Sequence, residues 1–246
     1  MSKALGLAQE VQQSLLPQND PSFTGFDIAG TSIYCDETGG DYYDFIETNR
    51  GGHAGLAVMV GDVSGHGVSS ALLMATARAL IMLRSSMPGE AAGIIDDVNR
   101  YLSLDTAQTG NFMTFFYCEL TQHEPGVRWV RAGHDPALVY DPFTDAFDEL
   151  KGQGPALGLD NTFEYNSFHR RLETGQVIML GTDGIWEMRN KTGEMFGKKA
   201  LMEIIRNNHT ASARQIVDTV TDVLERFRED ETPEDDITLV VIKVDR

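Results

Sequence analysis

The chain has 246 residues, 41% of them hydrophobic and 23% charged, which is ordinary for a globular protein with a sizeable core. Its 37 acidic residues outnumber 20 basic ones, and the formal net charge of −17 argues against nucleic acid and anionic lipid as general partners. There is no run of about 18 apolar residues and no basic-plus-apolar leader, so we expect neither a membrane span nor secretion. Two isolated cysteines, Cys35 and Cys118, are typical of a reducing compartment, and we expect a cytoplasmic protein.

Residues 1–16 predict a helix that ends at Pro17. Its apolar positions alternate in steps of three and four, which is the spacing of a coiled-coil stripe, and they are Met1, Ala4, Ala8, Val11 and Leu15. Two interpretations stay open. The helix either lies on its own domain, or it pairs with a second copy or continues from an upstream sensory segment.

Residues 26–34 predict a strand and 35–40 a turn, after which Gly39-Gly40-Asp41-Tyr42-Tyr43-Asp44 leads into a second strand. Asp41 and Asp44 are an odd number of positions apart, so on a strand they face opposite sides, and at most one of them joins a shared cluster. The Gly-Gly-Asp turn weakly resembles that of diguanylate cyclases. This leaves a nucleotide cyclase as an alternative, although such an enzyme needs a nucleotide loop that we do not find.

An apolar run over residues 55–60 ends at Asp62, and the chain then turns through glycines into a helix predicted over Val68–Leu83. The glycines at 61, 65 and 67 allow a sharp bend and a close approach of backbone to a ligand. This order places a carboxylate at the end of a rigid strand. A Gly-Asp corner is also a common turn or helix cap, so this motif proves little by itself.

Further along, the pattern predicts a helix over 89–104, strands over 112–120, 127–132 and 137–140, and strand-like alternation over 163–172. Gly133-His134-Asp135-Pro136 is expected to join two strands of a hairpin. His134 could act in acid–base chemistry, but we favour a hydrogen-bonded structural role.

Residues 176–182 repeat the central theme, because an apolar strand again ends in Asp183-Gly184. We interpret Trp186 as a packing residue. Two helices, about 198–207 and 211–228, and an acidic run precede a last apolar strand over 237–242, at whose start lie Asp235 and Asp236. Since no internal repeat or low-complexity linker is present, we expect one domain, residues 18–246, after the N-terminal helix, residues 1–17.

Acidic residues therefore lie at the ends of strands that are far apart in sequence: Asp41, Asp62, Asp183 and the pair Asp235/Asp236. Such carboxylates converge only if their strands are neighbours, and they raise one another's pKa unless a cation neutralises them. All-oxygen ligation suits Mg²⁺ or Mn²⁺, and no Cys/His spacing favours zinc. Two such ions roughly 4 Å apart share a bridging carboxylate and acidify a bridging water, which suits in-line attack on a phosphoryl group.

The motifs of other phosphoryl and acyl chemistry are missing from the sequence. There is no Gly-x-Ser-x-Gly elbow, no Cys-(x)5-Arg cradle and no Gly-x-x-x-x-Gly-Lys-Ser/Thr loop. Their absence supports metal-activated hydrolysis.

Six segments in a fixed order resemble the SpoIIE/RsbU-type phosphatases, bacterial members of the metal-dependent protein phosphatase 2C (PP2C) superfamily. They are Gly-Gly-Asp-Tyr-Tyr-Asp (39–44), Gly-Asp-Val-Ser-Gly-His-Gly (61–67), Phe-Met-Thr-Phe-Phe-Tyr (112–117), Ala-Gly-His-Asp-Pro (132–136), Thr-Asp-Gly-Ile (182–185) and Asp-Asp-Ile-Thr-Leu (235–239). The resemblance runs from about residue 9 to the C-terminus. It implies an α+β fold, a four-layer αββα sandwich of two antiparallel sheets flanked by helices.

The resemblance also implies two Mn²⁺ or Mg²⁺ ions at one edge of the sandwich. Asp62 would bridge them, the carbonyl of Val63 and the side chain of Asp41 would serve one ion, and Asp183 and Asp235 the other. Asp62 and Asp183 are the expected catalytic residues, and a metal-bridging hydroxide would attack phosphorus directly. Asp235 is preferred to Asp236 because it holds the first position of its motif, and Asp41 is preferred to Asp44 on the same ground.

The implied substrate is a phosphoserine or phosphothreonine on a STAS-type anti-sigma factor antagonist or a related regulator. The N-terminal helix would resemble the linker through which an upstream sensor domain or protein switches these enzymes, usually as homodimers. Eukaryotic relatives grip the phosphate with an arginine, and residues 31–44 contain none. The substrate-binding residues therefore stay unassigned. A catalytically silent regulator-binding module and a hydrolase of small phosphoesters are the remaining alternatives.

Overall fold

The computed structural model describes residues 3–50, 52–121, 126–229 and 232–245. Met1 of the predicted stripe and residues 230–231 of the acidic run lie outside these ranges. The described helices are α1 (Lys3–Leu15), α2 (Val68–Ser85), α3 (Ala91–Thr106), α4 (Gly197–Asn208) and α5 (Ala213–Arg228). The described strands are β1 (Phe26–Ile33), β2 (Tyr42–Arg50), β3 (His53–Val63), β4 (Met113–Thr121), β5 (Gly126–Ala132), β6 (Ala137–Asp141), β7 (Ala146–Leu150), β8 (Phe168–Arg171), β9 (Val177–Gly181) and β10 (Ile237–Val244).

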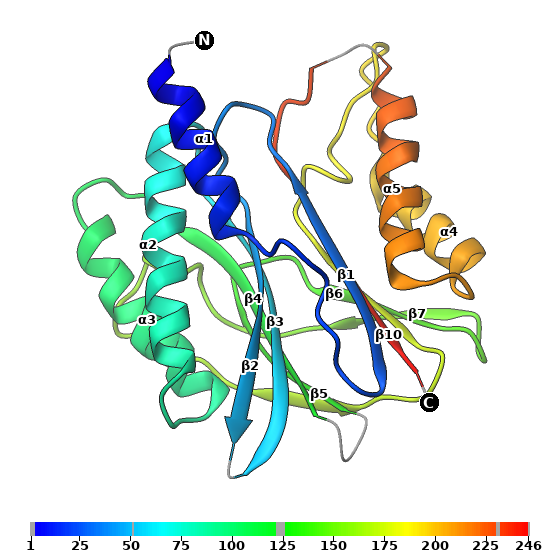
Figure 1. The fold of residues 1–246 in the computed structure, drawn as a ribbon, viewed down its shortest axis with the longest axis horizontal. Coiled ribbons are helices and arrows are strands. Elements are labelled where there is room, and N and C mark those ends of the chain that lie inside the picture. The colour runs from blue at the N-terminus through cyan, green and yellow to red at the C-terminus, as the bar shows by residue number, and fades with distance from the viewer. Residues whose placement is uncertain (1–2, 51, 122–125, 230–231, 246) are drawn as a thin grey trace.

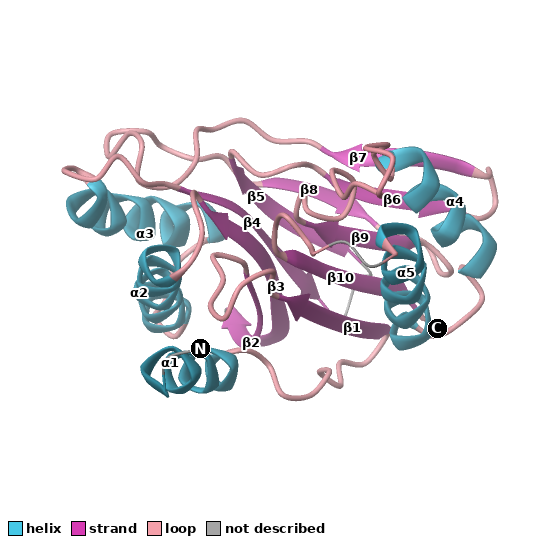
Figure 2. Ribbon diagram, turned by 90° about the horizontal axis from the view of Figure 1, so that it is seen from above, coloured by secondary structure: helices cyan, strands magenta, loops and turns pink. Residues whose placement is uncertain are grey.

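These strands form two five-stranded sheets, in the orders β1-β10-β9-β6-β7 (sheet 1) and β2-β3-β4-β5-β8 (sheet 2). Every described strand pair is antiparallel. The sheets lie face to face, with α1, α2 and α3 outside sheet 2 and α4 and α5 outside sheet 1 (Figures 1 and 2). The predicted α+β fold, a four-layer αββα sandwich, is confirmed.

Residue alternation along the strands explains the layers. On β10, Val240 and Ile242 point into the core between the sheets, whereas Leu239 and Val241 join the second core under α4 and α5. The second core is covered by α5, whose buried residues recur at helical spacing and are Ala213, Ile216, Val217, Val220 and Leu224. Residues 56–60 of β3 are all buried in the first core, since sheet 2 is covered on both faces.

Helix α2 is the one described helix whose length and apolar composition would allow it to cross a membrane. In the structure it packs against sheet 2 and α3. Met74, Ala77 and Ile81 are fully buried, and Arg78 lies 3.4 Å from a carboxylate oxygen of Asp44 on β2. One face of α2 is thus packed on the domain, although only 28% of the helix is buried and Leu72 and Leu83 are exposed.

One sequence prediction was wrong. Strands β5 and β6 do not form a hairpin, because β5 pairs with β4 and β8 in sheet 2 while β6 pairs with β7 and β9 in sheet 1. Gly133–Pro136 is instead a crossover between the sheets. At its start Gly133 adopts φ 69° and donates to the carbonyl of Gly154, and a Cβ at Gly133 would lie 2.7 Å from the amide nitrogen of Ala156. The backbone of Gly154 and Ala156 thus passes close to Gly133, and this close approach redirects the chain from one sheet to the other.

Candidate metal centre

Strand β3 ends and β10 begins at the same end of the sandwich (Figure 1). Asp62 is the last residue but one of β3 and lies opposite Thr114 of β4. Directly after it, the amide of Val63 donates to the carbonyl of Gly40, at 3.3 Å. A Cβ at Gly40 would lie 2.8 Å from the carbonyl oxygen of Val63, so the glycine permits this approach. The Gly39–Asp41 segment and the end of β3 are thus in direct contact.

Asp41 is 2% exposed and connects this contact to sheet 1. Its Oδ2 accepts a hydrogen bond of 2.8 Å from the hydroxyl of Thr182, the residue before Asp183. The same hydroxyl oxygen accepts a bond of 3.0 Å from the amide of Thr238, at the start of β10. The segments that carry Asp41, Asp183 and Asp235 therefore meet at Thr182.

The carboxylates interact strongly with one another. Burial, together with the charges of Asp183, Asp235 and Asp236, raises the pKa of Asp62 to about 7. Burial and the charge of Asp62 hold the pKa of Asp41 well above its usual value, and burial and the charge of Asp235 raise the pKa of Asp183. These carboxylates therefore act on one another electrostatically, and without a counterion their negative charges destabilise one another.

The alternatives Asp44 and Asp236 have other partners. Asp44 accepts a hydrogen bond from the hydroxyl of Tyr42 at 3.0 Å and faces Arg78 of α2. Asp236 is 4% exposed and accepts from the amides of Cys35 and Gly40, at 2.9 and 2.8 Å. Asp235, in contrast, is exposed.

The donor set fits a hard divalent cation in kind, because it consists of carboxylate and carbonyl oxygens. Within the residues that the structure describes, no group of three or more His, Cys, Asp or Glu side chains is closed around a common point as a metal cluster. The hydroxyl of Tyr34 is buried without a hydrogen-bond partner, and the charges of Asp236 and Asp41 help to raise its pKa. A buried hydroxyl without a hydrogen-bond partner beside several carboxylates indicates that this centre binds a ligand.

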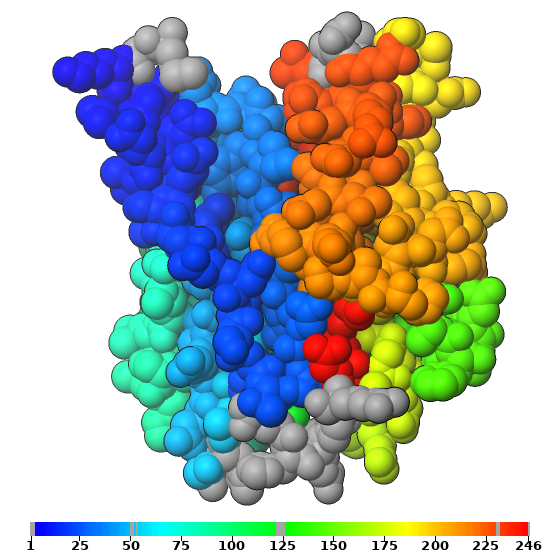
Figure 3. Space-filling view, turned by 45° about the vertical axis from the view of Figure 1, so that its right-hand side comes forward, coloured from blue at the N-terminus to red at the C-terminus, as the bar shows by residue number. Residues whose placement is uncertain are grey.

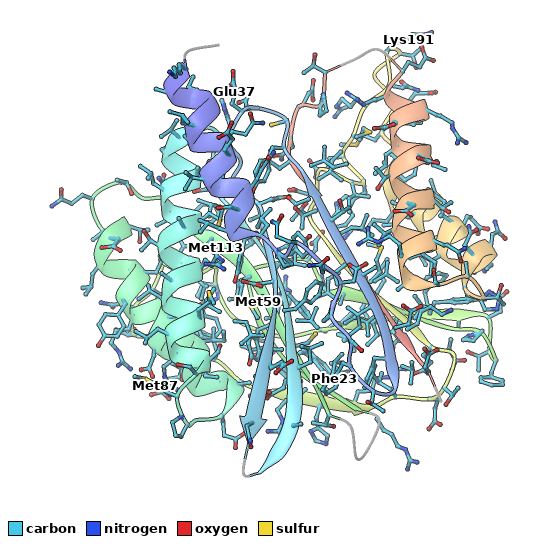
Figure 4. The ribbon with its side chains drawn as sticks, viewed as in Figure 1. Phe23, Glu37, Met59, Met87, Met113 and Lys191 are labelled. Carbon is cyan, nitrogen blue, oxygen red and sulfur yellow. The ribbon has the colours of Figure 1, made fainter. Side chains whose placement is uncertain are left out.

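The molecular surface is hollowed at the end of the sandwich where β3 ends. In Figure 3 this hollow lies between α1 and its blue neighbours on one side and the orange α5 on the other. Glu37 and Lys191 lie on opposite sides of this hollow (Figure 4). A pocket of about 520 Å³ borders the acids at Gly184 and Asp235, and its walls carry three basic residues, Arg189, Lys191 and Arg228.

Trp186 is half-buried against the core under α4 and α5, which agrees with a packing role. The amino group of Lys198 lies 4.3 Å from the centre of its ring and 2.8 Å from a carboxylate oxygen of Asp135. The negative charge of Asp135 in turn contributes to the raised pKa of Asp183. The positively charged amino group of Lys198 is therefore held at the edge of the acid cluster.

Sequence reasoning did not identify Thr182 and Tyr34 as members of the site. Thr182 precedes Asp183 in its motif, and this position could have indicated a role in the site. Its hydrogen bond to Asp41, however, depends on the pairing of distant strands. Nothing in the local pattern around Tyr34 distinguishes it from any other strand-end tyrosine.

Comparison with known proteins identifies relatives along the whole chain. The family model of Stage II sporulation protein E (SpoIIE) matches residues 52–245. The phosphoserine phosphatase RsbU of Bacillus subtilis is 26% identical over 237 residues, which are 96% of this chain and 69% of RsbU.

Two solved structures have the same fold. The SiaA-PP2C domain of Pseudomonas aeruginosa superposes with a TM-score of 0.83 at 22% identity, covering 98% of this chain and 96% of that domain. RsbX, solved in complex with magnesium, superposes with a TM-score of 0.65 at 12% identity, covering 92% of this chain and 98% of RsbX.

Proposed function

This chain belongs to the SpoIIE family and is a protein-serine phosphatase of the PP2C type, and we propose that it hydrolyses phosphoserine or phosphothreonine on a bacterial regulator protein with the help of divalent cations. The observation that carries the proposal is the contact between the segments that bear Asp41, Asp62 and Asp183 at one end of the sandwich, where the amide of Val63 donates to Gly40 and the hydroxyl of Thr182 donates to Asp41.

In this proposal, two Mn²⁺ or Mg²⁺ ions are held by Asp41, Asp62, Asp183, Asp235 and the carbonyl of Val63. When bound, such ions supply water activation and stabilise the negative charge of the reacting phosphoryl group. The protein supplies the rest. Asp62 lies at the end of strand β3, and the hydroxyl of Thr182 orients Asp41. Both carboxylates are therefore positioned before the substrate arrives.

We further propose that the substrate is a phosphorylated STAS-type regulator and that the reaction takes place in the cytoplasm. An upstream sensor domain or protein would act through α1, as part of a homodimer. Two observations support these points: Leu7 and Val11 expose 53% and 62% of their surface on α1, and Cys35 and Cys118 are both free thiols.

Activity and stability together test the centre. We expect Mn²⁺-dependent hydrolysis of p-nitrophenyl phosphate and of phosphorylated STAS proteins from the same genome. Asp62→Asn and Asp183→Asn should each lower kcat by about 100-fold or more, since each removes a carboxylate that would hold a divalent ion. In the metal-free protein the same variants should raise Tm, because a charge is removed from a repelling cluster.

The control is Asp222→Asn, an exposed residue of α5 paired with Arg226, which should leave both quantities unchanged. If the wild-type protein binds the phosphorylated regulator tightly but hydrolyses neither substrate with Mn²⁺ or Mg²⁺, the chain is a silent binding module. If it hydrolyses only small phosphoesters, the regulator is not its substrate.

A further inference from the structure

The side chain of Asp236 bonds to the backbone of a segment about 200 positions earlier in the chain, which follows β1, the neighbour of β10 in sheet 1. Oδ1 accepts from the amide of Cys35 at 2.9 Å. Oδ2 accepts from the amide of Gly40 at 2.8 Å and, more weakly, from that of Asp41 at 3.4 Å. Both carboxylate oxygens are thus engaged with backbone N–H groups, and the residue is 4% exposed.

Two glycines make room for this residue. A Cβ at Gly39 would lie 2.2 Å from Oδ2 of Asp236, and a Cβ at Gly184 would lie 2.0 Å from its carbonyl oxygen. No real Cβ is tolerated at such distances. The glycine of the Gly-Gly-Asp motif and the glycine of the Asp-Gly motif therefore both serve the approach of Asp236, from two different sides.

Asp235 has a different environment. It is exposed, its Oδ1 accepts from the amide of Asp236 next to it at 2.8 Å, and its charge acts on Asp62 and Asp183. The charge of Asp236 also acts on Asp41 and Asp62, but its two carboxylate oxygens are bonded to backbone amides, whereas Asp235 is exposed.

We propose that Asp236 is a positioning residue and not a metal ligand: its carboxylate holds the turn of residues 35–41 so that Asp41 faces Asp62. This inference rests on the proposed function for its catalytic consequence only. A carboxylate is required because both oxygens must accept. An asparagine would offer one acceptor and turn its NH₂ group toward an N–H donor, which leaves a buried donor without a partner.

The test compares Asp236→Asn with Asp235→Asn in the intact chain. In metal-free protein, amide hydrogen exchange of Cys35 and Gly40 should accelerate by about tenfold or more in Asp236→Asn, because bonds to a charged acceptor are lost. Exchange of these amides should be unchanged in Asp235→Asn. The metal-free Tm should fall in Asp236→Asn and rise in Asp235→Asn, where only repulsion is removed.

Calorimetric titration with Mn²⁺ provides a second readout. Asp236→Asn should bind the same number of ions as the wild type with an affinity about 10- to 100-fold weaker, as expected for a residue that orients a ligand. Asp235→Asn should bind fewer ions. Should Asp236→Asn fail to fold, Gly39→Ala, which displaces the carboxylate, is expected to accelerate exchange at Gly40 in the same way.

The proposal is overturned if Asp236→Asn keeps the Gly40 amide protected, or if it binds fewer ions while Asp235→Asn binds the full number. A wild-type protein that binds no Mn²⁺ would refute the proposed function. The exchange experiment would still decide whether Asp236 positions the turn, so the two failures are distinguishable.

Discussion

His134 connects the two sheets through a single neutral ring. One ring nitrogen, Nε2, lies 3.1 Å from the carbonyl oxygen of Gly181 on β9, and Nδ1 lies 2.8 Å from the hydroxyl of Thr114 on β4. Because a carbonyl oxygen only accepts, Nε2 carries the proton and Nδ1 accepts from the hydroxyl. The structural role predicted for this histidine agrees with these contacts.

This residue makes stability depend on pH. Burial lowers the pKa of His134 to about 4, whereas the unfolded chain titrates near 6.5. Its contribution to the free energy of unfolding is therefore fully present above pH 6.5 and is lost as pH falls toward 4, by about 2 kcal/mol at pH 5. Urea denaturation of metal-free wild type and His134→Gln at pH 7.5 and 5 measures this.

We expect the wild type to lose more stability than His134→Gln over that interval. The carboxylates of the acid cluster are common to both proteins, so their titration cancels in the difference. Parallel pH profiles for the two proteins would show that His134 is not held neutral by the fold.

At the scale of an element, α1 is bonded directly to the candidate centre. The side chain of Gln12, which is 4% exposed, donates from Nε2 to the carbonyl of Gly39 at 2.6 Å and accepts from the amide of Gly39 at 3.1 Å. Gly39 is two residues from Asp41. A displacement of α1 therefore acts on the turn that carries a proposed ligand, which is a physical basis for control through this helix.

Replacing Gln12 tests this connection. Gln12→Ala removes both bonds to Gly39 and should lower kcat for p-nitrophenyl phosphate by about tenfold, with a smaller effect on Tm. The matched control is Gln13→Ala, since Gln13 is the next residue of the same helix and is exposed. Equal activities of the two variants would mean that α1 does not support the centre.

The exposed apolar residues of α1 lead to a separate prediction about homodimer formation. Leu7→Glu with Val11→Glu should shift a homodimer to monomer, because charges would be buried in a helix pair. Sedimentation equilibrium measures the mass. A mass that is unchanged by the double substitution would exclude these two residues from the dimer interface.

At the scale of the whole molecule, the net charge of −17 repels an acidic phosphoprotein, while the pocket beside the acids carries basic residues. The loop that bears Arg189 and Lys191 is held by a bridge between Arg189 and Met195 and by the Asn190 side chain, which accepts from the amides of Thr192 and Glu194. Within this loop Arg189 donates to the carbonyl of Gly193 and Lys191 pairs with Glu229, and Glu187 and Glu234 line the same pocket.

We expect this pocket to receive the polypeptide beside the phosphoserine. Arg189→Glu with Lys191→Glu should raise KM for the phosphoprotein by about tenfold and leave p-nitrophenyl phosphate hydrolysis unchanged, because the small substrate does not extend into the pocket. The control is Arg226→Glu with Arg171→Glu, which reverses two exposed charges outside the pocket. If both charge reversals change KM equally, the effect is one of net charge and the pocket is not the cause.

Much of this architecture follows from local patterns. Alternation and apolar runs located β1, β3, β9 and β10, and amphipathic spacing located the helices, because burial of one face acts on neighbouring residues of the same segment. The acids at the strand ends were evident for the same reason. Strand β7 and the short extent of β8 were not predicted, since both strands lie at sheet edges, where burial is weaker.

The sequence alone therefore determined most of the elements, the four-layer fold class through its motifs, and the positions of the acids. It did not determine which member of the pair Asp235/Asp236 faces the cluster, the crossover at Gly133–Pro136, or the bond from Thr182 to Asp41. The bonds of Asp236 and Thr182 join segments 196 and 141 residues apart, and the crossover depends on the contact of Gly133 with Gly154, beyond its own turn. Their energies exist only after the two sheets have packed, so no local pattern records them.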